Sequence, residues 1–208
     1  MIADRIRSLD KRNIAETWFR TVISGHAHEG VFTSHTKNLP SRFSAGNRSR
    51  PQYEILYLSE SPDVSLAETR FHHGILTRPR TSTAPQPELF VVIPVEVELT
   101  DVADLTHPEQ ADLINTNAQE LTGDWRAYSK RVKPDGCTSL THTETSPTQQ
   151  IGQALFDCGE YKGFITFSAV EPAHANLVIF PERLTGTGSR IKYAYTDHHG
   201  NQNQMQIP

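Results

Sequence analysis

In the run LFVVIPVEVEL (residues 89–99), apolar residues alternate with Glu96 and Glu98. Alternation with a period of two predicts a β-strand with one buried face and one solvent-exposed face. Because proline has no backbone N–H, Pro94 places this strand at a sheet edge or at a bulge. Two later runs, GFITFS (163–168) and NLVIF (176–180), are almost continuously apolar. They predict two buried strands, and the short loop between them favours their pairing.

Two serine–proline pairs predict helix starts, at Ser61 and at Ser146. A serine side chain can accept a hydrogen bond from an early backbone N–H of a helix, and proline suits the first helical position. In the second helix the apolar residues follow at i, i+3, i+4 and i+7, and Gly159 is expected to end it. These apolar residues are Ile151, Ala154, Leu155 and Cys158.

These elements predict an α+β fold of short, mostly antiparallel strands with flanking helices. We expect a single domain over residues 1–208, with its core at about 18–184. Residues 108–128 are expected to be mostly helical, with an interruption at Thr122 and Gly123.

Polar segments rich in turn-forming residues are expected to connect these elements. Residues 78–86 and 133–146 are predicted to be loops. The chain ends, including the C-terminal HHGNQNQMQIP, are expected to fray or to form a final edge hairpin.

Composition and charge exclude several classes of protein. The chain has 36% hydrophobic and 21% charged residues, as soluble globular proteins do, and no apolar run approaches the roughly 20 residues of a membrane span. The N-terminus lacks the apolar region of a signal peptide, which favours a cytoplasmic location. A net charge of −4 disfavours direct nucleic acid binding over the whole surface, although Arg42, Arg48 and Arg50 could form a local basic groove for a phosphate-bearing ligand.

Metal and redox chemistry have little support in the sequence. Cys137 and Cys158 are the only cysteines, and they do not have the spacing of a zinc site. None of the ten histidines stands in an HExxH motif. No metal site is therefore predicted.

Glu68 is the residue with the most unusual predicted position. In a helix that starts at Ser61, Glu68 falls on the apolar stripe formed by Val64, Ala67 and Phe71. A buried carboxylate costs free energy unless it is paired or hydrogen-bonded, so it needs a partner or a task. Taken alone, such a glutamate is more often structural than functional.

Ordered blocks along the chain resemble the RES domain, a family named for an arginine, a glutamate and a serine. The blocks are RF at 42–43, ILYLSESPDVSLAE, PTQQIGQAL and YKGFITFSAVEPAHANLVIFPERL. Arg42, Glu68 and Ser168 occupy the three positions that give the family its name. Phe43 stands where the family usually has tryptophan or tyrosine, and Ser41 where it often has glycine.

The resemblance implies a toxin of a bacterial toxin–antitoxin pair, with a fold similar to ADP-ribosyltransferases. Such toxins use NAD⁺ as a substrate, not as a cofactor, and degrade it by hydrolysis or phosphorolysis or transfer ADP-ribose to a protein acceptor. The resemblance also implies an antitoxin partner with a helix-turn-helix domain. The absence of a GxGxxG or Walker motif agrees with NAD⁺ bound as a substrate outside a Rossmann fold.

The residue types suit this chemistry. Cleavage of the nicotinamide–ribose bond develops positive charge on the ribose, and nicotinamide leaves as a neutral base without a general acid. Glu68 could stabilise that charge, Arg42 could bind the pyrophosphate or ribose, and Ser168 could hold Glu68 or a ribose hydroxyl. Phe43 and Tyr57 are candidates for stacking on the nicotinamide ring.

Asn176 is a further candidate for a hydrogen bond to the ligand or to the backbone. Three hypotheses stay open at this point: destruction of NAD⁺, mono-ADP-ribosylation of a protein, and a non-catalytic binding module in which Glu68 is structural.

Overall fold

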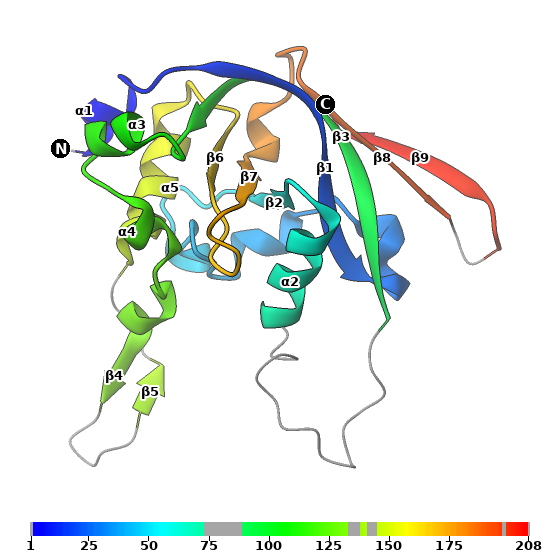
Figure 1. The fold of residues 1–208 in the computed structure, drawn as a ribbon, viewed down its shortest axis with the longest axis horizontal. Coiled ribbons are helices and arrows are strands. Elements are labelled where there is room, and N and C mark those ends of the chain that lie inside the picture. Colours follow the sequence, from blue (N-terminus) through cyan, green and yellow to red (C-terminus); the bar gives the residue numbers. More distant parts are fainter. Residues whose placement is uncertain (1, 73–88, 133–137, 141–144, 197–198, 208) are drawn as a thin grey trace.

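The structure is a computed structural model that describes residues 2–72, 89–132, 138–140, 145–196 and 199–207. Its main feature is a seven-stranded sheet in the order β1-β2-β7-β6-β3-β8-β9. Because β3 also pairs with β1, the first five of these strands close into a ring (Figure 1). The strands are β1 (Arg12–Ile23), β2 (Leu56–Ser59), β3 (Phe90–Asp104), β6 (Gly163–Phe167), β7 (Ala175–Ile179), β8 (Arg190–Thr196) and β9 (Gln202–Ile207), with β4 (Lys130–Val132) and β5 (Thr138–Leu140) in a separate pair.

The pairing in the main sheet is antiparallel except between β3 and β6. This agrees with the predicted mostly antiparallel sheet. The expectation of short strands is wrong for β1, with 12 residues, and β3, with 15, which pair along most of their length. Pro94 lies where β3 pairs with β1 alone, since the pairing with β8 begins at Val95, so the predicted edge position is confirmed.

Helices cover one side of the ring, where α1, α3, α4 and α5 lie, and the β8–β9 hairpin projects from the opposite side (Figure 1). No helix in the described ranges is both long and apolar enough to cross a membrane. The α-helices are α1 (Ile2–Ile6), α2 (Pro62–His72), α3 (Pro108–Leu113), α4 (Ala118–Thr122) and α5 (Pro147–Cys158). The 3₁₀ helices are η1 (Ser24–Glu29), η2 (Ser34–Lys37), η3 (Gly46–Arg48), η4 (Trp125–Ser129) and η5 (Pro181–Arg183).

Both serine–proline helix starts are confirmed. The Ser146 side chain accepts a hydrogen bond from the Gln149 backbone N–H, and the Gln149 side chain accepts one from the Ser146 N–H, which caps α5. Gly159 ends α5 in the left-handed conformation with φ of 73°. The Ser61 side chain accepts in the same way from the third residue of α2.

The orientation of α2 agrees with the prediction in part. Val64 is 2% exposed and Glu68 is 9% exposed, so the helix does turn this glutamate inward. Phe71 is 42% exposed, so the predicted apolar stripe does not extend to it.

Several other predicted elements are present. The β6–β7 hairpin and the C-terminal β8–β9 hairpin are confirmed. Residues 108–128 are mostly helical as predicted, with the expected break at Gly123 and a further break at 114–117 that was not predicted. The predicted loop at 78–86 lies outside the described residues, as does much of the one at 133–146, including Cys137.

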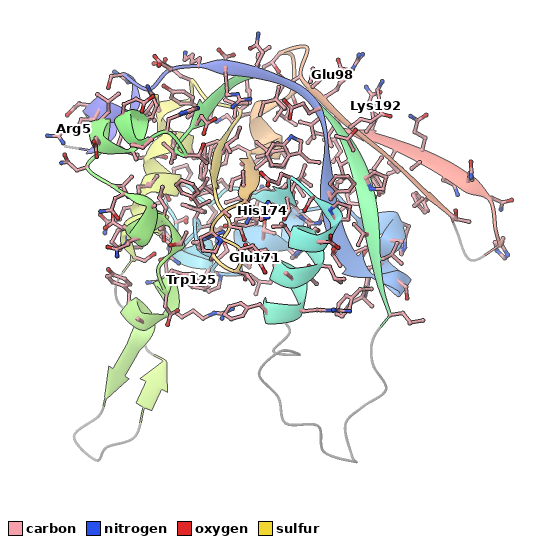
Figure 2. All side chains as sticks on the ribbon, viewed as in Figure 1. Arg5, Glu98, Trp125, Glu171, His174 and Lys192 are labelled. Atoms are coloured by element: carbon pink, nitrogen blue, oxygen red, sulfur yellow. The ribbon has the colours of Figure 1, made fainter. Side chains whose placement is uncertain are left out.

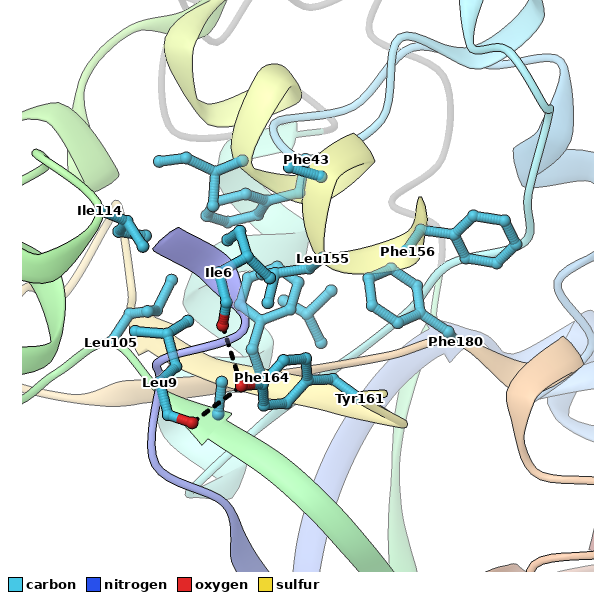
Figure 3. Close-up of a cluster of buried hydrophobic side chains, with 14 of the residues drawn as sticks. Ile6, Leu9, Phe43, Leu105, Ile114, Leu155, Phe156, Tyr161, Phe164 and Phe180 are labelled. Atoms are coloured by element: carbon cyan, nitrogen blue, oxygen red, sulfur yellow. Dashed lines mark hydrogen bonds between the residues drawn. The ribbon is translucent and has the colours of Figure 1, made fainter. Parts of the chain in front are cut away.

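Two hydrophobic clusters fill the two faces of the sheet. Along β2, Leu56 and Leu58 pack in one cluster, whereas Tyr57 packs against the other. Figure 3 shows the cluster beneath α5, which includes Phe43, Leu155, Phe164 and Phe180. The sheet is therefore buried on both sides around its centre.

The N-terminal segment packs into the cluster beneath α5. The expectation that this chain end frays is therefore wrong. Ile6 and Leu9 are buried. Their backbone carbonyls accept hydrogen bonds of 2.9 and 2.8 Å from the Tyr161 hydroxyl, drawn as dashed lines in Figure 3. The hydrophobic core therefore includes residues before position 18, where it was predicted to begin.

Candidate active site

Glu68 is held by three hydrogen bonds to one carboxylate oxygen. Its Oε1 accepts from the Ser168 hydroxyl at 2.6 Å, from Asn176 Nδ2 at 2.8 Å and from the Ala169 backbone N–H at 3.1 Å. Hydrogen bonds to a carboxylate favour its ionised form. The partner that a buried glutamate requires is therefore present.

The β6–β7 hairpin supplies these donors. Ser168 directly follows β6, and Asn176 faces Thr166 across the hairpin. The Ser168 hydroxyl also accepts from the backbone N–H groups of Val170 and Glu171, which fixes the turn. Figure 2 shows the hairpin loop, marked by Glu171 and His174, near the centre of the molecule.

Arg42 lies beside Glu68, with its Nη2 3.9 Å from Glu68 Oε1. Its Nη1 donates to the backbone carbonyls of Leu121 and Phe167, at 3.3 and 3.2 Å. Arg42 is 7% exposed, and this burial lowers its pKa, while the negative charge of Glu68 favours the charged guanidinium. The arginine is thus fixed in orientation by α4, β6 and the carboxylate.

The turn that carries Arg42 is clamped by α5. Gln149 Nε2 donates to the carbonyls of Ser41 and Ser44, at 2.9 and 3.2 Å. A Cβ atom on Gly152 would lie 2.0 Å from the Phe43 carbonyl oxygen, so only glycine allows this close approach. Helix α5 therefore sets the position of the turn and of Arg42.

Phe43 does not serve as the predicted stacking face, because its ring is 0% exposed in the core beneath α5. Neighbouring residues of a tight turn point in different directions, and here Arg42 points to the cavity and Phe43 away from it. The Arg42 guanidinium lies 5.2 Å from the Phe43 ring centre. Phe43 therefore contacts Arg42 through a cation–π interaction.

A cavity of about 480 Å³ opens in front of Glu68 and Arg42. Tyr57 and Asn176 also line it, whereas Ser168, 0% exposed, lies behind Glu68. The wall is completed by residues of β1, η2, the 39–41 turn, β2 and the residue before it, α2 and η4: Arg20, Thr21, His35, Thr36, Leu39, Pro40, Ser41, Ile55, Ser59, Ser65, Thr69, Trp125 and Arg126. Four of the six predicted site residues thus line one cavity, Ser168 contacts Glu68 from outside the cavity wall, and Phe43 does not reach the cavity.

Tyr57 and Asn176 are polar residues in the wall of this cavity. The Tyr57 hydroxyl accepts from the Phe43 backbone N–H and bonds to Ser41 Oγ, and burial raises the pKa of the phenol, so it is neutral at physiological pH. Asn176 Oδ1 is buried and has no hydrogen-bond partner within the described ranges. A buried carbonyl oxygen of this kind is suited to a ligand hydroxyl.

Arg20 is a site residue that the sequence pattern did not identify. It comes from β1, lines the cavity and donates from Nη1 to the Tyr57 carbonyl at 3.2 Å. Its Nε is buried without a hydrogen-bond partner, and no ion-pair partner occurs for it in the part of the chain that the structure describes. Desolvation lowers its pKa to about 10, so it remains cationic at neutral pH. A half-buried cation beside a cavity, with no carboxylate partner among the described residues, suits an anionic ligand.

Trp125 adds an aromatic side chain to the wall from η4 (Figure 2). The neighbouring Arg126 guanidinium lies 5.4 Å from the Trp125 ring centre and also lines the cavity. Aromatic faces at this cavity therefore come from Tyr57 and Trp125, and not from Phe43.

The arginines predicted to share a basic groove are divided between two places. Arg42 faces the cavity of Glu68, whereas Arg48 and Arg50 line a separate cavity with Arg7 and Asp157. Among the described residues, no group of three His, Cys, Asp or Glu side chains could hold a metal ion.

Comparison with solved structures shows a protein of similar fold, and comparison with family profiles shows the family of this chain. A chain in the crystal structure of the M. tuberculosis MbcT–MbcA toxin–antitoxin complex has a similar fold, with a TM-score of 0.59 over 99% of this chain and 90% of that chain, at 15% identity. The sequence profile of the RES domain matches residues 4–197. The chain belongs to the RES domain family. No curated protein sequence matches it.

Proposed function

We propose that this protein is a toxin that cleaves NAD⁺ at the bond between nicotinamide and ribose. The observation that carries the proposal is Glu68, a carboxylate fixed by Ser168, Asn176 and the Ala169 N–H beside Arg42 in the wall of a cavity. The cavity has a volume of about 480 Å³, which lies within the usual range of small-molecule sites. NAD⁺ is the substrate in this proposal and not a cofactor.

The reaction requires stabilisation of positive charge and no acid. As nicotinamide departs with the electrons of the glycosidic bond, positive charge develops on the anomeric carbon and the ring oxygen of the ribose. The Glu68 carboxylate would stabilise this charge, and it would do so more strongly in a cavity than in bulk water. Ser168 acts as a positioning residue, because it contacts Glu68 and not the cavity.

The other cavity residues would bind the remaining parts of the substrate. Asn176 Oδ1 would accept from a ribose hydroxyl, and Arg42 would lie at the ribose end beside Glu68. Arg20, which lacks a counter-ion in the described residues, is the better candidate for the pyrophosphate. Tyr57 and Trp125 would supply aromatic faces for nicotinamide.

The toxin assignment is supported by family membership and by the fold shared with a chain of a toxin–antitoxin complex. We infer an antitoxin partner with a helix-turn-helix domain, action in the cytoplasm, and kinship of the fold with ADP-ribosyltransferases. Expression without the antitoxin is then expected to lower cellular NAD⁺ and arrest growth.

The direct test is release of nicotinamide from NAD⁺ by the purified full chain, with and without phosphate. Free ADP-ribose would indicate water as the acceptor, and its phosphorylated form would indicate phosphate. Label transferred from NAD⁺ to a discrete protein of a cell extract would indicate mono-ADP-ribosylation instead. If nicotinamide is released under none of these conditions, the proposal is wrong.

A further inference from the structure

A second cavity of about 620 Å³ adjoins the cavity of Glu68. The two share Arg20 and His35 in their walls. The rest of the second cavity is lined by Val22 of β1 and by residues of the segment 24–34: His26, Glu29, Phe32 and Ser34. The two cavities therefore lie next to each other at Arg20 and His35, and Glu68 lines the first of them.

Arg20 stands at the junction of the two cavities. It is cationic, its Nε lacks a partner, and its one hydrogen bond among the described residues goes to a neutral backbone carbonyl. A guanidinium binds phosphate oxygens through parallel N–H donors. An anionic group that passes from one cavity to the other would therefore be neutralised here.

The side chains beyond Arg20 suit a nucleoside. Phe32 is 48% exposed, so one face of an aromatic ring is available for stacking on a base. Glu29, whose carboxylate lies 3.4 Å from His26 Nδ1, offers acceptors for ribose hydroxyls at the same cavity. The first cavity thus holds the carboxylate of Glu68, the second holds Phe32 and Glu29, and Arg20 belongs to both walls.

We propose that the second cavity binds the adenosine half of NAD⁺, with Phe32 stacked on adenine and Arg20 on the pyrophosphate. This inference rests on the proposed function, since it assigns the part of the same substrate that is remote from the scissile bond. It makes the enzyme selective for a dinucleotide over nicotinamide mononucleotide, which has the same scissile bond but no adenosine.

The test compares kcat/KM for NAD⁺ and for nicotinamide mononucleotide, measured as nicotinamide release by the purified full chain. The wild type is expected to prefer NAD⁺. Phe32→Ala is expected to lower the ratio of the two kcat/KM values about tenfold, because base stacking on the aromatic ring is lost. Phe32→Tyr, which keeps an aromatic face, is expected to retain the ratio. Leu113→Ala is the control, because Leu113 is similarly exposed and lines neither cavity.

The outcomes separate this inference from the proposed function. A wild type that cleaves neither compound rejects the proposed function and the inference with it. A wild type that cleaves both equally well, or a folded Phe32→Ala variant with an unchanged ratio, rejects the inference alone. If Phe32→Ala does not fold, Phe32→Leu takes its place, with the same expected loss.

Discussion

Arg20 is a half-buried cation whose desolvation has a consequence for stability. Its desolvation is not offset by a carboxylate among the described residues, and its lowered pKa of about 10 reports that cost. Arg20→Met is therefore expected to raise the free energy of unfolding by about 1 kcal/mol, or the melting temperature by roughly 2–4 °C. The same variant should raise KM for NAD⁺ about tenfold, since a charge-assisted hydrogen bond is lost. Calorimetry measures the melting temperature, and steady-state kinetics measure KM. A lower melting temperature in Arg20→Met would show instead that the charge stabilises the fold.

Ser168 offers a second prediction at the scale of the residue. Ser168→Ala removes the 2.6 Å hydrogen bond to Glu68 and leaves the N–H groups of Val170 and Glu171 without their acceptor. We expect a loss of about 1–3 kcal/mol in unfolding free energy and a lower kcat with little change in KM. Urea unfolding and steady-state kinetics measure these effects. The exposed Ser8→Ala is the matched control, and a normal kcat in Ser168→Ala would contradict the positioning role.

The group formed by Glu68, Arg42 and Ser168 could be predicted from the sequence, for physical reasons that differ from residue to residue. The helical period alone turns Glu68 inward, and the resemblance to the RES domain adds Arg42 and Ser168. The role of Phe43 was wrong because sequence neighbours on a turn need not share a face. Arg20 was missed because the strand that carries it was not predicted.

At the scale of the element, the approach of α5 to the Arg42 turn is the feature most sensitive to one methyl group. Gly152→Ala would place Cβ against the Phe43 carbonyl, so α5 and the turn must separate. We expect a loss of about 1–3 kcal/mol in unfolding free energy together with reduced nicotinamide release. Thermal melting and the activity assay measure both effects. Gly25→Ala is the control, because a Cβ there has no neighbour within 4 Å. Full activity and stability in Gly152→Ala would contradict the clamp.

Elements with local boundary residues could be predicted, and others could not. The ends of α5 and the start of α2 follow from serine, proline and glycine at fixed positions. In β1 the buried positions are Ile14, Trp18 and Thr21, separated by four and three residues. This spacing is closer to a helical period than to the alternation of a strand, so the pattern hides β1.

At the scale of the whole molecule, Tyr161 connects the N-terminal segment to the core through two backbone carbonyls. Burial raises the pKa of Tyr161 to about 12 from its usual 10. The neutral phenol therefore contributes stability that is fully present below pH 10 and is lost as the pH rises through about 12. Tyr161→Phe should lower the unfolding free energy by about 1 kcal/mol at pH 7 and reduce the loss of stability above pH 10.

Denaturant unfolding at several pH values measures this, and KM should stay unchanged because Tyr161 does not line the cavity. An identical decline in stability for both proteins between pH 10 and 12 would contradict the assignment to Tyr161.

The closure of the sheet could not be predicted from the sequence. It depends on pairing between β1 and β3, whose partners are far apart in the chain, as Arg12 and Val102 are. Hydrophobic alternation indicates which face of a strand is buried, but it does not identify the partner strand. The hairpins β6–β7 and β8–β9 were predictable because their partners are neighbours in sequence.

The central claim is that the ionised Glu68 promotes cleavage of the nicotinamide–ribose bond. The most direct measurement is the rate of nicotinamide release from NAD⁺ by Glu68→Gln beside Glu60→Gln, a nearby glutamate that pairs with His174 and does not line the cavity. We predict that Glu68→Gln is folded but about 10²–10³-fold slower than the wild type, because it lacks the negative charge at the developing cation, whereas Glu60→Gln keeps its activity. A folded Glu68→Gln protein that releases nicotinamide at the wild-type rate would contradict the claim.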